Sequence, residues 1–313
     1  MDIGQKLSAI ASNMGKILVG KAESLELVLA ALFARGHVLI EDVPGIGKTT
    51  LVSALAASLS LSFQRIQFTP DVMPSDIVGF SVYDRTEGKL RYQPGAVLHQ
   101  MVLADEINRA SPKTQSSLLE VMQESQVTVD GHTYAVPLPF IVLATQNPVE
   151  HVGTFPLPEA QLDRFLLRVS LGYPGIREEI DILNLHDGPS PEAKSLSPVL
   201  SAEEVQTLQA VTDAVVCSEA IKEYIALIAG QTRSNPDILL GASPRAAVAL
   251  MRASKAYALI KGREYVLPDD VIHMAIPVLA HRLMLKPEAR LTDTSTERII
   301  KTILQTTRIP ESA

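Results

Sequence analysis

A strand-like apolar run, His37–Ile40, leads directly into the Gly-rich segment Glu41–Thr50 (EDVPGIGKTT), and a helix-forming stretch follows. Glycines allow backbone N–H groups to close around phosphate oxygens, and the start of the new helix presents its positive end to them. In such a loop Lys48 reaches the terminal phosphates and Thr49 holds Mg²⁺. The segment therefore predicts a phosphate-binding loop in an α/β fold. The alternative is a Gly-rich strand-to-helix turn without a ligand.

The loop departs from the usual spacing at Asp42, because a glycine is expected six positions before the lysine. Asp tolerates unusual backbone angles better than most residues, so the turn can still form. A carboxylate that pointed at phosphates would repel them, and we expect this side chain to point away. The nucleotide-binding residues predicted in the loop are Pro44, Gly45, Ile46, Gly47, Lys48, Thr49 and Thr50.

Composition narrows the class of protein. The chain has 313 residues, enough for two domains, with 46% hydrophobic and 20% charged residues, as in ordinary globular proteins. It has no apolar run of membrane-spanning length and no secretory signal pattern, and its lone Cys217 fits a reducing cytoplasm. The net charge of −7 and the 4% aromatic content argue against nucleic acid as a partner.

Five short apolar runs alternate with helical stretches, which predicts a parallel sheet covered by helices on both faces. The runs are His37–Ile40, Arg65–Phe68, Met101–Ala104, Phe140–Ala144 and Phe165–Ser170. Turn-rich residues from 186 to 198 indicate a linker, and the chain beyond them reads as helical. We therefore predict an α/β core over residues 1–190 and an all-helical domain over residues 191–313.

Helix-start signals support this division. Ser111-Pro112 and Ser243-Pro244 each place Ser at an N-cap and Pro at the first helical position. Ser201 and Glu204 have the spacing of a capping box. We expect the helix that begins at Pro244 to run as far as Gly262.

Two carboxylates follow the third apolar run, in Met101–Glu106 (MVLADE). At the end of a buried strand, Asp105 would organise Mg²⁺ through its water shell. Glu106 would accept a proton from the attacking water, or orient that water. The alternative is a solvated acidic pair at a strand end.

Three further polar residues are candidates for the site. Asn147 follows the fourth run and could position the water, with Thr145 and Gln146 as second choices; Asn-Pro also favours a simple turn. Arg164 precedes the fifth run and either pairs with Asp163 or reaches a neighbouring subunit's nucleotide.

Arg245 lies in the first turn of the helix that Ser243-Pro244 opens, where a cation opposes the helix dipole. A γ-phosphate or a nearby carboxylate would offset that cost. Sequence reasoning leaves both partners open.

Together these segments resemble the MoxR-type AAA+ ATPases, in order and over nearly the whole chain. The matching segments are Glu41–Thr49, Leu103–Ala110, Lys113–Glu124, Ala144–Pro148, Leu157–Phe165 and Gly241–Ala246. The resemblance implies a five-stranded parallel sheet followed by a helical lid. It assigns Lys48 and Thr49 to Walker A, and Asp105 and Glu106 to Walker B.

The resemblance also assigns Asn147 to sensor 1, Arg164 to a finger that acts on the neighbouring subunit, and Arg245 to sensor 2 on a lid that closes over ATP. It implies an ATP- and Mg²⁺-dependent homo-oligomer, often a hexameric ring. Such rings act as chaperone-like remodelling or maturation factors, frequently beside a von Willebrand factor A-domain protein.

Two segments, Ser81–Gly95 and Val127–Pro137, alternate polar and apolar residues around Glu87-Gly88 and Asp130-Gly131, which predicts two hairpin insertions. They could face a central pore and touch substrate, or be solvated surface hairpins. Three functions stay open at this stage. They are a ring ATPase that reshapes protein partners, a nucleic-acid-stimulated motor, and a slow nucleotide-gated adaptor.

Overall fold

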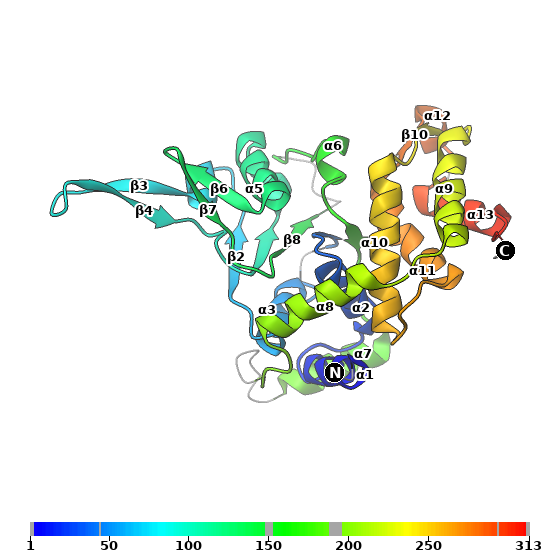
Figure 1. Ribbon diagram of the computed structural model, residues 1–313, viewed down its shortest axis with the longest axis horizontal. Coiled ribbons are helices and arrows are strands. Elements are labelled where there is room, and N and C mark those ends of the chain that lie inside the picture. Colours follow the sequence, from blue (N-terminus) through cyan, green and yellow to red (C-terminus); the bar gives the residue numbers. More distant parts are fainter. Residues whose placement is uncertain (1–2, 44, 148–152, 188–195, 293, 311–313) are drawn as a thin grey trace.

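The structure is a computed structural model that describes residues 3–43, 45–147, 153–187, 196–292 and 294–310. A five-stranded sheet with the order β2-β5-β8-β1-β9 lies at its centre, and every pairing in it is parallel (Figure 1). The predicted fold class is confirmed, and each strand overlaps one of the five apolar runs. The strands are β1 (Val38–Glu41), β2 (Phe63–Gln67), β5 (Met101–Asp105), β8 (Ile141–Gln146) and β9 (Leu167–Val169).

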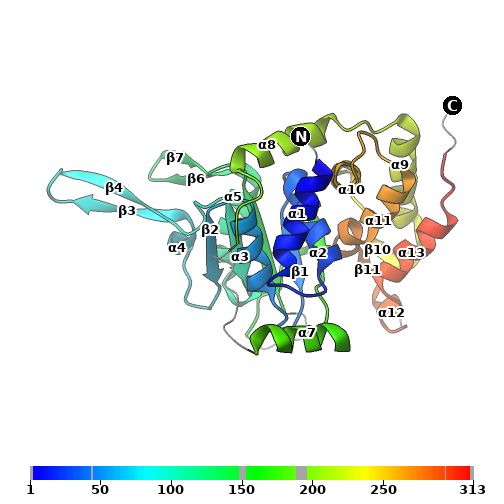
Figure 2. The same cartoon turned by 90° about the horizontal axis from the view of Figure 1, so that it is seen from below.

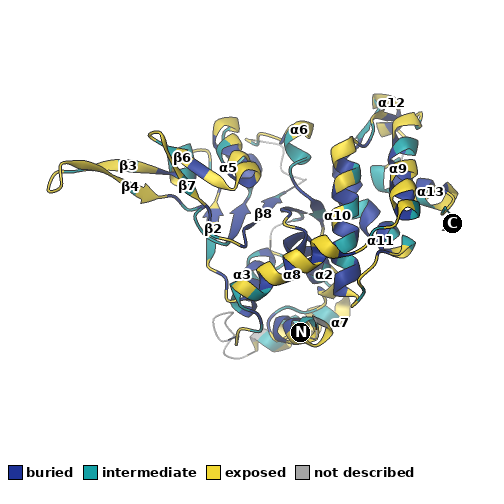
Figure 3. Cartoon of the chain, in the orientation of Figure 1, coloured by how far each residue is buried: buried dark blue, intermediate teal, exposed yellow. Residues whose placement is uncertain are grey.

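Both faces of the sheet are buried, and successive residues of a strand enter different cores. In β1, Val38 and Ile40 pack into the larger core and Leu39 into the smaller one. This alternation explains why the inner strands β5, β8 and β1 are mainly apolar, whereas the edge strand β2 carries polar residues. Strand β8 is accordingly dark along most of its length in Figure 3. The larger core includes α1 (Ile3–Gly15), α2 (Ala22–Phe33) and α3 (Lys48–Ser58), and α5 (Pro112–Glu124) closes the smaller core.

Two hairpins extend from the side of the sheet where β2 lies (Figures 1 and 2). The first pairs β3 (Gly79–Asp84) with β4 (Lys89–Pro94), and the second pairs β6 (Gln126–Val129) with β7 (His132–Ala135). Both lie where the sequence predicted insertions. The remaining short elements of this half are α4 (Pro74–Val78), η1 (Ile107–Arg109) and α6 (Glu159–Leu162), and α7 (Ile176–His186) follows β9.

The C-terminal part is helical, with one addition that the sequence did not predict. A two-stranded antiparallel ribbon joins β10 (Ile238–Leu240) to β11 (Met284–Leu285). The helices are α8 (Ala202–Ala214), α9 (Glu219–Ser234), α10 (Pro244–Ile260), α11 (Pro268–Leu279), η3 (Ala280–Arg282), α12 (Pro287–Arg290) and α13 (Thr296–Thr306). Among the described residues, no helix combines the length and apolar character needed to cross a membrane.

The predicted helix starts agree with the structure. The hydroxyls of Ser111, Ser201 and Ser243 each accept a hydrogen bond from the backbone N–H three residues later. Helix α10 ends two residues before Gly262, whose φ of +74° is the left-handed conformation that glycine adopts easily. The division at residue 190 falls among residues 188–195, outside the described part of the chain, so the two-domain boundary stays a prediction.

Candidate functional site

The predicted phosphate loop connects β1 to α3 as a tight turn. Gly45 and Gly47 have φ values of +87° and +89°, which side-chain-bearing residues rarely adopt. Helix α3 begins at Lys48, inside the Gly-rich segment, so Lys48, Thr49 and Thr50 form its first turn. The positive end of an 11-residue helix therefore faces the loop. Pro44, the remaining predicted contact, lies outside the described residues.

Asp42 points away from the loop, as expected. Its carboxylate accepts hydrogen bonds from the Ser170 hydroxyl (2.8 Å), the Gly172 N–H (3.2 Å) and the Leu171 N–H. The Lys21 ammonium donates to the carbonyls of Leu171 (2.7 Å) and Gly172 (3.0 Å). Asp42 thus ties the start of the phosphate loop to the chain that leaves β9.

Lys48 is buried, and its ammonium donates to the Asp42 carbonyl at 2.8 Å. Burial lowers the pKa of Lys48, while the negative charges of Asp105, Asp42 and Glu106 act in the opposite direction. These acidic residues lie where β1 and β5 end. Anionic phosphates entering the loop would add to that support for the charged form.

Asp105 ends β5 with both carboxylate oxygens engaged. Oδ1 accepts from the Thr145 hydroxyl at 2.6 Å, and Oδ2 accepts from Arg65 Nη2 at 2.7 Å and Nε at 3.1 Å. Thr145 also accepts the Glu106 N–H at 2.8 Å. Thr145, a second choice in the sequence reasoning, therefore holds both acidic residues in place.

Glu106 has a φ of +57°, which is uncommon for a residue with a side chain and recurs at functional sites. Its carboxylate accepts from Gln67 Nε2 at 2.8 Å and from Arg109 Nη1 at 3.0 Å. The sequence reasoning did not single out Arg65 or Gln67. The sequence offers only a partial signal, two polar residues at alternate positions of one strand, and does not show that this strand lies beside Asp105.

The predicted residues at the ends of the strands meet in one cavity of about 360 Å³. Parallel strands place their carboxyl ends at a single edge of the sheet, which brings segments far apart in sequence together. The cavity is lined by Gly45, Gly47, Lys48, Thr49, Thr50, Arg65, Gln67, Asp105, Glu106 and Asn147. The Thr49 hydroxyl and the Asp105 carboxylate are oxygen donors of the kind that suits Mg²⁺.

A second cavity of about 570 Å³ lies on the other side of the phosphate loop. Its walls include Ile17 and Leu18 before α2, Ile46 of the loop, and Tyr173 and Leu183 from the chain after β9. A mostly apolar recess beside a phosphate loop suits a flat nucleobase. The apolar lining of this cavity could not be predicted from the sequence, because its segments are distant in sequence and carry no motif.

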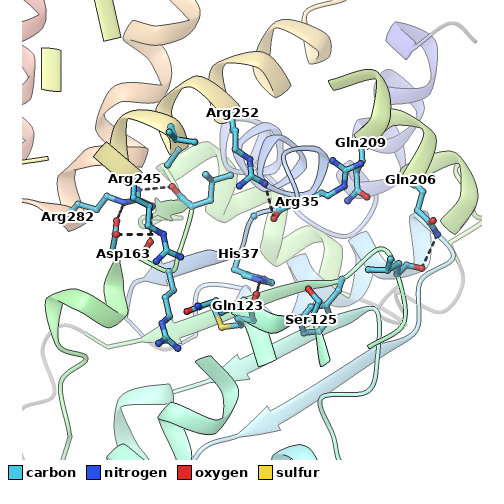
Figure 4. A pocket seen from close by; sticks show the side chains of 18 residues that line it. Arg35, His37, Gln123, Ser125, Asp163, Gln206, Gln209, Arg245, Arg252 and Arg282 are labelled. Atoms are coloured by element: carbon cyan, nitrogen blue, oxygen red, sulfur yellow. Dashed lines mark hydrogen bonds and ion pairs between the residues drawn. The ribbon is translucent and has the colours of Figure 1, made fainter. Parts of the chain in front are cut away.

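The structure does not bring Arg164 and Arg245 into the phosphate cavity. Both line a separate cavity of about 450 Å³, shown in Figure 4, together with His37, Phe140 and Leu166. Those three residues immediately precede strands, so this cavity lies where the strands begin. The length of β1, four residues, alone separates the two edges by roughly 13 Å. The expectation that Arg245 closes over the ATP of its own subunit is therefore not what this arrangement shows.

Asp163 is the carboxylate of that edge. It accepts from Arg282 Nε at 2.7 Å and lies 3.8 Å from Arg245 Nε (Figure 4). A γ-phosphate and a nearby carboxylate were the two partners considered for Arg245. The carboxylate is present, as Asp163. The alternative pairing of Asp163 with Arg164 is wrong, because Arg282, buried under β9, takes that place. Among the described residues, the Arg164 side chain, which is only half-buried, has no ion pair.

The fold and the site define a class, the P-loop proteins with an AAA-type α/β core followed by helices. Residues 37–167 match the family described as ATPase family associated with various cellular activities (AAA), and residues 230–303 match the AAA lid domain. Nucleotide binding follows from the AAA domain.

Individual relatives are more specific. The chain is 49% identical to uncharacterized protein YeaC of Bacillus subtilis (strain 168), over 99% of this chain and 96% of that protein. It is 41% identical to Chaperone MoxR1 of Mycobacterium tuberculosis, over 95% and 80% respectively. The crystal structure of a candidate ATPase from Cytophaga hutchinsonii matches with a TM-score of 0.92 and 38% identity, over 99% and 96%. The chain belongs to the MoxR family of AAA+ ATPases.

Proposed function

We propose that this protein hydrolyses ATP with Mg²⁺ at the edge of the sheet where β1, β5 and β8 end. The observation that carries the proposal is the single cavity that gathers Lys48, Thr49, Asp105, Glu106 and Asn147. Bound Mg²⁺ would offset the negative charge of the outer phosphates. Lys48 and the α3 N-terminus bind the phosphates, and Thr49 and Asp105 hold the cation.

Glu106 and Asn147 act on the water in this scheme. The carboxylate of Glu106 accepts the proton of the attacking water or fixes its orientation, and the Asn147 amide positions the same water. In the structure Gln67 and Arg109 hold the Glu106 carboxylate, so these contacts loosen before the carboxylate turns to water.

We further propose that Arg164 and Arg245 serve the nucleotide of a neighbouring copy. Both lie at the edge opposite the phosphate loop, and an arginine there is placed to balance charge on a phosphoryl group across an interface. An interface between unlike faces repeats around a closed ring, for which a hexamer is our proposal. The two projecting hairpins then form the surface that touches a protein substrate.

The cellular role we propose is chaperone-like remodelling or maturation of protein partners, with a von Willebrand factor A-domain protein as one candidate. The support is the relative named Chaperone MoxR1 and the hairpins, whose Tyr83 and Leu90 side chains are about 60% exposed. A cytoplasmic location fits the single cysteine.

The test replaces Glu106 with Gln. We expect Glu106→Gln to retain Mg·ATP binding and to lose turnover by roughly 10²- to 10⁴-fold, the usual contribution of a general base. Binding is followed with a fluorescent ATP analogue and turnover by phosphate release. The matched control is Glu223→Gln on the exposed face of α9, which should hydrolyse ATP like the unaltered protein. Turnover by Glu106→Gln within a few-fold of normal would remove this role from Glu106.

A further inference from the structure

We propose that Arg65 is a positioning residue that holds Asp105 in the absence of metal and releases it when Mg·ATP binds. Arg65 would thereby set how strongly nucleotide binding depends on Mg²⁺. The inference rests on the proposed function, because it takes the cavity beside Asp105 to be the Mg·ATP site.

The geometry starts with the register of the sheet. Strand β2 is an edge strand, and its Gln67 lies opposite Asp105 while Arg65 lies opposite Leu103. Side chains two residues apart share one face of a strand. Arg65 and Gln67 therefore lie on the same face as Asp105, and Arg65 extends along that face to reach the carboxylate.

The contact satisfies the aspartate without a metal ion. Arg65 places Nε and Nη2 on one oxygen of Asp105, and Thr145 places its hydroxyl on the other. The Asp105 side chain is 13% exposed, so its charge is better shielded from water than that of a surface carboxylate. Partly buried carboxylates of this kind need a compensating cation.

Charge explains why this pairing matters for metal binding. Lys48 and Arg65 balance Asp105 and Glu106 in the lining of the cavity. A cation arriving at Asp105 has to displace the guanidinium, since two positive groups on one carboxylate repel each other. Arg65 can move, because its side chain is 46% exposed at the sheet edge and is otherwise held by Gln67.

Two consequences follow for a protein without the Arg65 charge. Metal-free ATP should bind more weakly, because Asp105 then repels the phosphates without compensation. Mg·ATP should bind as well as before or better, because no ion pair has to break. The ratio of the two dissociation constants, metal-free over Mg²⁺-bound, should therefore rise.

The experiment measures binding of a fluorescent, non-hydrolysable ATP analogue to the full chain in excess EDTA and in excess Mg²⁺. We expect Arg65→Met, which keeps the aliphatic stem, to raise the ratio by about three- to tenfold. Arg65→Lys, which keeps the charge, should give a ratio between that of the unaltered protein and that of Arg65→Met. In an Asp105→Asn background, Arg65→Met should leave the ratio unchanged. Arg290→Ala, at an exposed arginine of α12, serves as the control and should match the unaltered protein.

An unchanged or lower ratio in Arg65→Met overturns the proposal, and so does an equal effect of Met and Lys. In either case the unaltered protein still binds the analogue with Mg²⁺, which leaves the proposed function standing. If the unaltered protein does not bind the analogue in Mg²⁺, both the proposed function and this inference fail.

Discussion

His37 shows how a single residue at the start of β1 is fixed in one protonation state. Its Nε2 donates to the Met122 carbonyl at 2.9 Å, and its Nδ1 accepts the Val142 N–H at 3.0 Å. The ring also meets Phe140 edge-on, with centroids 5.5 Å apart. Only a neutral imidazole can donate at one nitrogen and accept at the other. Burial lowers the pKa of His37 from 6.5 to about 4, in agreement with this geometry.

We expect this pKa shift to make the protein less stable in mild acid. Below pH 6.5 the His37 side chain of the unfolded chain becomes protonated, whereas in the folded chain it stays neutral until the pH approaches about 4. Stability therefore falls as the pH decreases through this window, by about 2 kcal/mol between pH 7.5 and pH 5 from this residue alone. Urea unfolding at the two pH values measures the loss.

His37→Gln should be less stable at pH 7.5 and lose less stability on acidification. Part of the acid sensitivity should remain, because burial also lowers the pKa of His281. The control is His132→Gln on the exposed β6–β7 hairpin, which should lose as much stability between pH 7.5 and pH 5 as the unaltered protein. An undiminished loss in His37→Gln would contradict the assignment.

At the scale of elements, the two hairpins form one unit through an aromatic stack. Tyr92 of β4 and Tyr134 of β7 lie with ring centroids 4.0 Å apart and planes inclined by 15°. The Tyr92 hydroxyl donates to the Val78 carbonyl, which fixes the base of the first hairpin. A two-stranded hairpin is marginally stable by itself, so the stack should contribute to its order.

We expect Tyr134→Ala to loosen the β3–β4 hairpin, although the substitution lies in the other hairpin. Loss of a stacked pair costs about 1 kcal/mol, which corresponds to about fivefold faster amide exchange in β3 and β4. Hydrogen exchange resolved by peptide measures this effect. Tyr83→Ala removes an exposed tyrosine outside the stack and should leave the exchange of β4 near Tyr92 unchanged. Equal exchange in the two variants would mean that the hairpins are independent.

The elements predictable from sequence are those in which local pattern and tertiary packing agree. Buried parallel strands are apolar throughout, and Ser-Pro pairs mark helix starts, so β5 and α10 lie close to their predicted limits. The β10–β11 ribbon was missed because strands of three and two residues carry no periodicity. Helix α3 begins at Lys48, within the segment that reads as a Gly-rich loop, because the loop glycines hide how soon the helix begins.

Site residues divide in the same way. Lys48, Asp105 and Glu106 could be found because their chemistry depends on neighbours in sequence. Arg65 could not, because its role depends on which strand lies beside β5, and strand order is set by the fold as a whole. The apolar wall at Ile17 and Tyr173 was inaccessible for the same reason.

At the scale of the molecule, the sheet separates two cavities. The phosphate cavity lies where the strands end, and the arginine cavity with Arg164 and Arg245 lies where they begin. Asp163 lies beside Arg245 and accepts from Arg282, whose buried guanidinium also donates to the carbonyls of Phe165 and Leu166, just before β9. This network anchors the lid-side arginine to the core at the edge away from the nucleotide. The ring that we propose, in which each copy completes the site of the next, would use both edges.

Mixed assemblies test this geometry. Arg245→Ala and Lys48→Ala should each be inactive alone, because every site lacks one essential cation. In an equal mixture that co-assembles at random, about one interface in four joins an intact Lys48 to an intact Arg245 from its neighbour, so activity should return to about a quarter of normal. A mixture of Arg164→Ala with Lys48→Ala should likewise recover about a quarter of normal activity. If Arg245 acted on its own subunit, the first mixture would stay inactive while the second recovered, since a site with intact Lys48 would always lack its arginine. The unmixed variants incubated under identical conditions are the controls, and phosphate release is the measurement.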